Sequence, residues 1–167
     1  GSCDQLEYLD LSQNSLLDLS LEGWVLLREN LARLSQLKAI DMSNNGLDSL
    51  NHEQSEELCK LIKECESLER VNFSSNELLA DVLEQAGALD NESIEEIMAY
   101  CTAFSNLQKL KRLEISANSL GVMPGQLWKH FCSCLIECRG LNFLDISNNK
   151  LFNLTTDGWD HFATSIR

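Results

Sequence analysis

Apolar residues recur along this chain in one eleven-residue phrase, L-x-x-L-x-L-x-x-N-x-L, in which Ile, Val, Met or Phe replaces some of the leucines. The five copies occupy residues 6–16, 37–47, 68–78, 110–120 and 141–151, so their starts are 31, 31, 42 and 31 residues apart. Self-similarity at a nearly fixed period in this range is typical of a solenoid built from stacked repeats.

Within each phrase, apolar and polar residues alternate, which predicts a short strand with one buried face at 9–11, 40–42, 71–73, 113–115 and 144–146. If the first leucine of each repeat is position 0, apolar residues return at positions +18, +21 and +25, as in Trp24, Leu27 and Leu31. This spacing indicates an amphipathic helix after every strand. We therefore expect a curved α/β stack with parallel strands on the concave face and helices on the convex face.

These phrases and helices resemble the leucine-rich repeat family, in particular its ribonuclease-inhibitor-like, helix-containing subclass. The resemblance implies a right-handed leucine-rich-repeat solenoid of about five repeats. It also implies that the asparagine of each phrase turns inward and hydrogen-bonds neighbouring backbone. The residues of this expected ladder are Asn14, Asn45, Asn76, Asn118 and Asn149.

Residues 3–167 are expected to form one domain, because 167 residues with 44% hydrophobic content suffice for one continuous core. Residues 1–2 are typical of the remnant of a cleaved expression tag. The repeat register begins at the end of a helix and stops inside another, from which we expect a segment of a longer protein.

The 42-residue interval contains extra residues at about 79–92, which predict a short helix and loop before the next main helix. Ser93 and Glu96 have the spacing of a capping box for that main helix. Insertions of this kind often contact partners, although they also arise as neutral loop growth. The candidate contact residues here are Leu79, Leu83 and Leu89.

The seven cysteines occupy regular places in the repeat. Six fall at positions +22 and +28 and are predicted to be buried thiols, namely Cys3, Cys59, Cys65, Cys101, Cys132 and Cys138. Cys134 is left over and is expected to share an outward helix face with His130. Two such ligands are too few for a structural zinc site, so no metal is expected. Free buried thiols and an odd count favour a reducing, cytoplasmic setting.

Catalytic motifs are absent from the sequence, which lacks G-x-S-x-G, a phosphate-binding glycine loop and H-E-x-x-H. We therefore expect no enzyme activity and no cofactor. A net charge of -13 argues against nucleic acid as a partner, and no apolar run is long enough for membrane insertion.

The exposed strand positions remain as the candidate binding surface. Position +2 combines arginines with aromatic residues, which are enriched in binding hot spots, although these arginines could simply neutralise nearby carboxylates. Position +4 is an acidic column that is partly a habit of the family. The candidate partner-binding residues of the two columns are Tyr8, Arg70, Arg112 and Phe143 at +2, and Asp10, Asp41, Asn72, Glu114 and Asp145 at +4.

The resemblance thus implies an intracellular module that binds another protein through its concave strands and adjacent loops. Proteins with such repeats include host-directed bacterial effectors, which would act in the host cytosol. Two alternatives stay open: a GTPase-regulating or ubiquitin-ligase-associated regulator, and a self-assembling solenoid that associates with itself through open strand edges.

Overall fold

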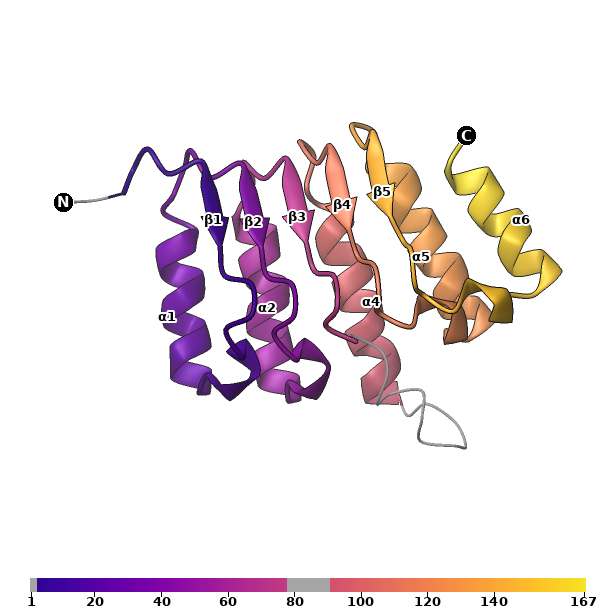
Figure 1. Ribbon diagram of the computed structural model, residues 1–167, viewed down its shortest axis with the longest axis horizontal. Coiled ribbons are helices and arrows are strands. Elements are labelled where there is room, and N and C mark those ends of the chain that lie inside the picture. The colour runs from indigo at the N-terminus through magenta and orange to yellow at the C-terminus, as the bar shows by residue number, and fades with distance from the viewer. Residues whose placement is uncertain (1–2, 78–90) are drawn as a thin grey trace.

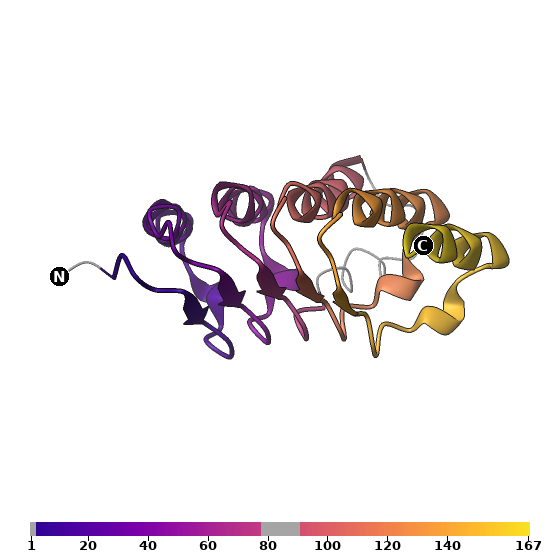
Figure 2. The same cartoon turned by 90° about the horizontal axis from the view of Figure 1, so that it is seen from above.

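Strands and helices form two separate layers that run side by side along the whole computed structural model (Figure 1). The structure describes residues 3–77 and 91–167, and the side chains from 94 onward in the second range. The strands lie closer together than the helices when the molecule is seen from above (Figure 2), so the strand layer is the inner, concave side. The two ends of the chain lie at opposite ends of the stack.

Each repeat contributes one three-residue strand and one longer helix, and a short 3-10 turn joins them in the four repeats whose connecting residues the structure describes in full. The strands are β1 (Tyr8–Asp10), β2 (Ala39–Asp41), β3 (Arg70–Asn72), β4 (Arg112–Glu114) and β5 (Phe143–Asp145). The helices are α1 (Leu21–Leu31), α2 (His52–Glu64), α4 (Asn91–Ser105), α5 (Gly125–Glu137) and α6 (Thr156–Ser165). The 3-10 turns are η1 (Leu16–Asp18), η2 (Leu47–Ser49), η3 (Leu120–Val122) and η4 (Leu151–Asn153).

The five strands form one parallel sheet in the order β1-β2-β3-β4-β5. Every strand begins one residue before the predicted segment, so the exposed +2 residue is part of the ladder. Because equivalent residues are paired, Tyr8 stands opposite Ala39, Ala39 opposite Arg70, Arg70 opposite Arg112, and Arg112 opposite Phe143. The expected α/β solenoid is confirmed, and its core lies between the two layers.

Each phrase ends in a turn in which the residue before the asparagine and the residue after it both have left-handed backbone. Only one of these ten positions is a glycine, Gly46; the others are Gln13, Ser15, Asn44, Ser75, Glu77, Ala117, Ser119, Asn148 and Lys150. Left-handed backbone costs a residue with a Cβ about 1–2 kcal/mol. The hydrogen bonds of the central asparagine, described below, offset this strain.

Four helices begin directly after the same repeat position, +14. The side chains of Ser20, Asn51 and Thr155 accept a hydrogen bond from the backbone N–H three residues on, and Asn51 forms a capping box with Gln54. Pro124 occupies this position before α5. The predicted capping box at Ser93 is wrong, because α4 already begins at Asn91 and Ser93 therefore lies inside the helix. The predicted short helix before it falls almost entirely outside the described residues.

A partly buried ion-pair network joins the first two helices. Arg28 on α1 donates from Nε to Glu57 Oε2 on α2 over 2.7 Å, and its Nη1 lies 3.0 Å from Glu64 Oε2. Lys60 donates to the other Glu57 oxygen over 2.8 Å. These bonds, the one from Lys60 foremost, hold the pKa of Glu57 below its ordinary value although burial acts in the opposite direction.

Helix α6 is less buried than its sequence pattern predicts, because no further repeat of the structure packs against its outer side. Trp24 and Trp128 are fully buried, whereas the equivalent Trp159 is 44% exposed and Ile166 is 60% exposed. Cys3 is exposed for the same reason, which corrects its predicted burial.

Candidate functional site

The nine predicted contact residues lie on the concave face in two neighbouring columns that run across the five strands. Tyr8, Asp10, Arg70 and Phe143 are exposed, and the exposed fractions of Tyr8 and Phe143 are 55% and 40%. A shallow depression crosses the middle of this surface. It is lined by Tyr8, Ala39, Ile40, Asp41, Arg70, Asn72, Arg112 and Glu114.

The acidic column at position +4 has a structural role in most repeats. Oδ1 of Asp10, Asp41, Asn72 and Asp145 accepts the backbone N–H two residues on, over 2.9–3.0 Å. Each side chain thereby closes the turn at the end of its strand. Hydrogen bonding from the side chains of Ser12 and Ser147 first, and from their backbone N–H groups second, lowers the pKa values of Asp10 and Asp145. The polar residue and the serine that recur two residues apart in these four repeats therefore stabilise the turn at the end of each strand.

Asp41 and Asn72 are engaged further. The Asn72 amide donates to Asp41 Oδ2 across the strands over 2.8 Å, and Ser43 Oγ donates to Asp41 Oδ1 over 2.6 Å. A carboxylate at position 72 would repel Asp41 on the neighbouring strand, whereas the Asn72 amide forms a hydrogen bond with it. These bonds fix the orientation of both side chains on the concave face.

Arg112 is held in place on two sides. Its Nε and Nη2 donate to the two oxygens of Glu114 over 2.9 and 2.8 Å. Its guanidinium also stacks on the ring of Phe143, with 3.6 Å between Cζ and the ring centre. Arg112, Glu114 and Phe143 therefore form a preorganised block at one end of the face, which we call the stacked block.

Arg70 stands directly beside Arg112 in the same column but is arranged differently. It is exposed, and within residues 3–77 and 91–167 no carboxylate lies within 4 Å of its guanidinium. Its neighbour on the other side is Ala39, the smallest residue of the column. Arg112 therefore neutralises a carboxylate by direct contact, whereas Arg70 acts on Glu69 only from a longer distance, as one of the smaller causes that lower the pKa of Glu69.

A further column, at position +1 of the repeats, was not predicted from the sequence. Glu7, Lys38, Glu69 and Lys111 alternate in sign along the stack, and Lys38 and Lys111 pair with the glutamates of the preceding repeats over 2.7 and 2.8 Å. The alternation was visible in the repeat register, because residues at one repeat position become neighbours across the sheet. These exposed pairs leave the +1 column internally neutralised.

The asparagines at position +8 connect successive repeats. Asn45, Asn76, Asn118 and Asn149 are at most 1% exposed, and each donates from its amide to a carbonyl of the preceding repeat, the acceptors being those of Leu11, Met42, Phe73 and Ile115. Their Oδ1 atoms accept the backbone N–H of the preceding asparagine. Asn14 differs, since it is exposed and bonds Ser12 within its own turn.

Cys134 corrects the predicted outward pair on α5. It is only 9% exposed, because it packs toward α4, where Ser105 and Thr102 contact its thiol. His130 is half-buried, and its Nε2 lies 3.6 Å from Cys134 Sγ and 3.4 Å from Thr102 Oγ1. In the part of the chain that the structure describes, no three His, Cys, Asp or Glu side chains are placed to hold a metal ion.

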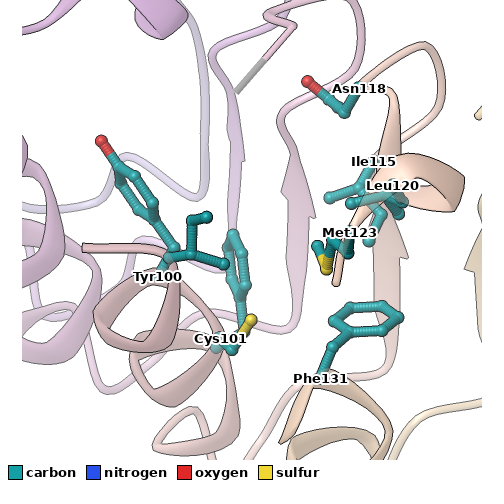
Figure 3. A pocket seen from close by; sticks show the side chains of 9 residues that line it. Tyr100, Cys101, Ile115, Asn118, Leu120, Met123 and Phe131 are labelled. Atoms are coloured by element: carbon teal, nitrogen blue, oxygen red, sulfur yellow. The ribbon is translucent and has the colours of Figure 1, made fainter. Parts of the chain in front are cut away.

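A small cavity lies between α4 and the turn after β4 (Figure 3). Cys101, Ile115, Met123 and Phe131 face it, while the Tyr100 hydroxyl turns away and donates to Ser55 Oγ over 2.9 Å. Its volume of about 30 Å³ is enough for little more than one water molecule, and an apolar lining does not retain one. We regard it as a packing void.

The remaining predictions concern the insertion and the membrane. Leu79, Leu83 and Leu89 lie outside the described residues. None of the helices in the described ranges has the length and apolar character that crossing a bilayer requires.

Comparisons with known proteins agree with this architecture. A family model described as Leucine Rich Repeat matches residues 5–27. A search of curated proteins found no match. The chain is similar in fold to the tropomodulin C-terminal domain of Caenorhabditis elegans, with a TM-score of 0.65 and 14% identity over 99% of this chain and 84% of that one.

Two other solved structures share the fold. The leucine-rich repeat-containing protein LegL7 from Legionella pneumophila has a TM-score of 0.60 and 17% identity, over 97% of this chain and 54% of that one, so this chain spans about half of its length. The actin-binding site 2 of leiomodin-1 has a TM-score of 0.58 and 12% identity, over 99% of this chain and 83% of that one. The five stacked repeats, the family model matched at residues 5–27 and these shared folds show that the chain has the fold of a leucine-rich-repeat solenoid.

Proposed function

We propose that this chain is a non-catalytic module that binds another protein through its concave strand face. The observation that carries the proposal is the register of the sheet, which gathers Tyr8, Arg70, Arg112 and Phe143 into one exposed column beside a shallow depression. Exposed aromatic and arginine side chains are the types that dominate binding energy at protein interfaces. The stacked block adds a preorganised surface, which reduces the entropy lost on binding.

Two of the similar folds offer a concrete partner to test. One is a tropomodulin domain and another is an actin-binding site of leiomodin-1. Their identity to this chain is low, so they support protein binding in general and make actin a first candidate only. Cosedimentation of the chain with filamentous actin, and gel filtration with monomeric actin, test this candidate directly.

A cytoplasmic location and a host-directed effector role form the finer part of the proposal. All seven cysteines are free, which supports a reducing compartment. The similarity to LegL7 extends to the fold and leaves the effector role as a hypothesis. Delivery of a reporter fusion into host cells during infection would test it.

The binding experiment compares three immobilised proteins in cell lysate: the wild type, a Tyr8→Ala/Arg70→Ala variant, and a convex-face control, Lys63→Ala/Glu66→Ala. Both altered pairs are surface residues, and far-UV circular dichroism checks that each variant is folded. We expect a partner that the wild type and the control retain and the concave variant loses. Equal retention by all three proteins would rule out the concave face. The self-assembly alternative predicts a molecular mass of the chain in solution that rises with protein concentration. It also predicts that charged substitutions on β1 reduce this rise.

A further inference from the structure

Arg70 is the one charged residue of the two concave columns for which no hydrogen bond and no ion pair within 4 Å is found among residues 3–77 and 91–167; it acts electrostatically on Glu69, whose pKa it helps to lower. Arg112 is bound to both oxygens of Glu114. Asp41 and Asn72 bind each other and their own turns. Asp10 and Asp145 each accept a backbone N–H. The position of Arg70 in the middle strand of five places this available guanidinium at the centre of the face.

The residue beside Arg70 is also distinctive. At position +2 the other strands carry Tyr, Arg or Phe, whereas β2 carries Ala39. The short side chain leaves the depression between Tyr8 and Arg70, with Ala39 and Ile40 among its lining. Tyr8 and Ala39 give one side of the depression apolar groups, with Ala39 about 4.8 Å from Arg70 at ordinary strand spacing, while Asp41, Asn72 and Glu114 make the rest of its lining polar.

We infer that the concave face recognises an extended segment of its protein partner in which an Asp or Glu side chain pairs with Arg70 and an apolar side chain, one or two residues away, fills the depression over Ala39. This inference rests on the proposed function and names the chemistry of the partner. An arginine fork matches a carboxylate in two parallel hydrogen bonds, which gives direction as well as affinity.

The surrounding charges restrict the kind of anion that fits. Asp10, Asp41, Glu114 and Asp145 share the face with Arg70 and Arg112, and the whole chain has a net charge of -13. A polyanion would meet repulsion on both sides of Arg70, because like charges in adjacent strands are unfavourable. A single carboxylate flanked by neutral or basic residues avoids this repulsion.

The test uses a displayed library of short random peptides, selected in parallel on the wild-type chain, on Arg70→Glu and on a convex control, Lys63→Glu, which changes the charge by the same amount. We expect the wild type and the control to enrich peptides with an Asp or Glu next to an apolar residue. We expect Arg70→Glu to enrich Lys or Arg in its place. A synthetic wild-type-selected peptide should bind Arg70→Gln at least about tenfold more weakly in calorimetry, the loss of one charge-assisted pair.

A second variant tests the depression without removing Arg70. Ala39→Glu places a carboxylate beside Arg70, at a position that is itself only 8% exposed. It should abolish peptide binding, and the unfolding midpoint of the variant is measured beside that of the wild type so that a loss of folding is recognised.

The outcomes separate the two levels of the proposal. Peptides that are lost in Ala39→Glu but carry no acidic residue, or that bind Arg70→Gln as tightly as the wild type, overturn this inference and leave the concave face as the binding surface. Failure to enrich any peptide, or peptides that bind all variants equally, overturns both.

Discussion

The guanidinium carbon of Arg112 lies 3.6 Å from the centre of the Phe143 ring on the next strand. A cation over an aromatic face at a partly exposed site contributes about 0.5–1 kcal/mol. We therefore expect Arg112→Gln and Phe143→Leu to show a coupling of this size in a double-mutant cycle of urea unfolding. The matched cycle of Arg70→Gln with Phe143→Leu should be additive within about 0.5 kcal/mol. Equal coupling in the two cycles would contradict the stacking.

Gly121 in η3 packs directly on the backbone of the next repeat. A Cβ at this residue would lie 2.3 Å from the carbonyl oxygen of Lys150 and 2.7 Å from Leu151 Cα, whereas a Cβ at Gly125 meets nothing within 4 Å. Backbone atoms cannot move aside as a side chain can. Gly121→Ala should therefore lower the free energy of unfolding by about 1–3 kcal/mol or more, the ordinary cost of overpacking. Chemical denaturation of Gly121→Ala and of Gly125→Ala, the control expected to match the wild type, checks this.

Asn76 joins two successive repeats through its side chain. Its amide donates to the carbonyls of Met42 and Phe73, and its Oδ1 accepts the Asn45 N–H over 2.7 Å. Asn76→Ala leaves these buried groups without partners and should cost at least about 2 kcal/mol. Asn14→Ala removes an exposed side chain of the same type and should cost less than about 1 kcal/mol. Similar unfolding midpoints for the two variants would show that burial of the ladder contributes little.

Acid should weaken the contact between α1 and α2. Hydrogen bonds from Lys60 and Arg28 hold the pKa of Glu57 below its ordinary value. Stabilisation by this carboxylate is therefore complete above the unfolded pKa, about 4.3, and is lost as the pH falls through the lower folded pKa. The lowered pKa values of Asp10 and Asp145 act in the same direction.

Urea unfolding at pH 7 and pH 3 measures this loss. Glu57→Gln should show a smaller difference in unfolding free energy between the two pH values than the wild type. Glu66→Gln, at an exposed turn, should keep the full difference. A wild-type difference retained in Glu57→Gln would assign the acid sensitivity to other carboxylates.

Thiol reactivity should divide the cysteines into one fast and six slow groups. Burial raises the pKa of Cys59 to about 12 and that of Cys65 to about 11, whereas Cys3 is exposed. Because the thiolate is the reactive form, brief treatment with iodoacetamide at pH 8 should alkylate Cys3 first. Mass spectrometry should find one modification in the folded protein and seven after unfolding in urea. Rapid modification of Cys134 in the folded protein would show that the α4–α5 contact opens.

Repetition made the fold predictable from the sequence. Five phrases in register fixed the strands to within one residue, the helices, and the buried asparagines, because a residue that recurs at one repeat position meets similar surroundings in every repeat. Two wrong predictions, for Cys3 and Asn14, lie at the first repeat, where no neighbour covers one side. Two others, for Ser93 and Cys134, lie inside the stack, where the start of α4 and the packing of α5 against α4 decide the outcome.

The candidate site shows the same division. The sequence by itself determined which side chains share the concave face, because parallel pairing of identical phrases places equal positions side by side. The tertiary structure alone decided how those side chains interact. Arg70 and Arg112 occupy the same column, yet only Arg112 finds a glutamate two residues along its own strand and a phenylalanine on the next. Whether a charge is paired or available depends on the reach and identity of its neighbours across the sheet, which periodicity does not specify.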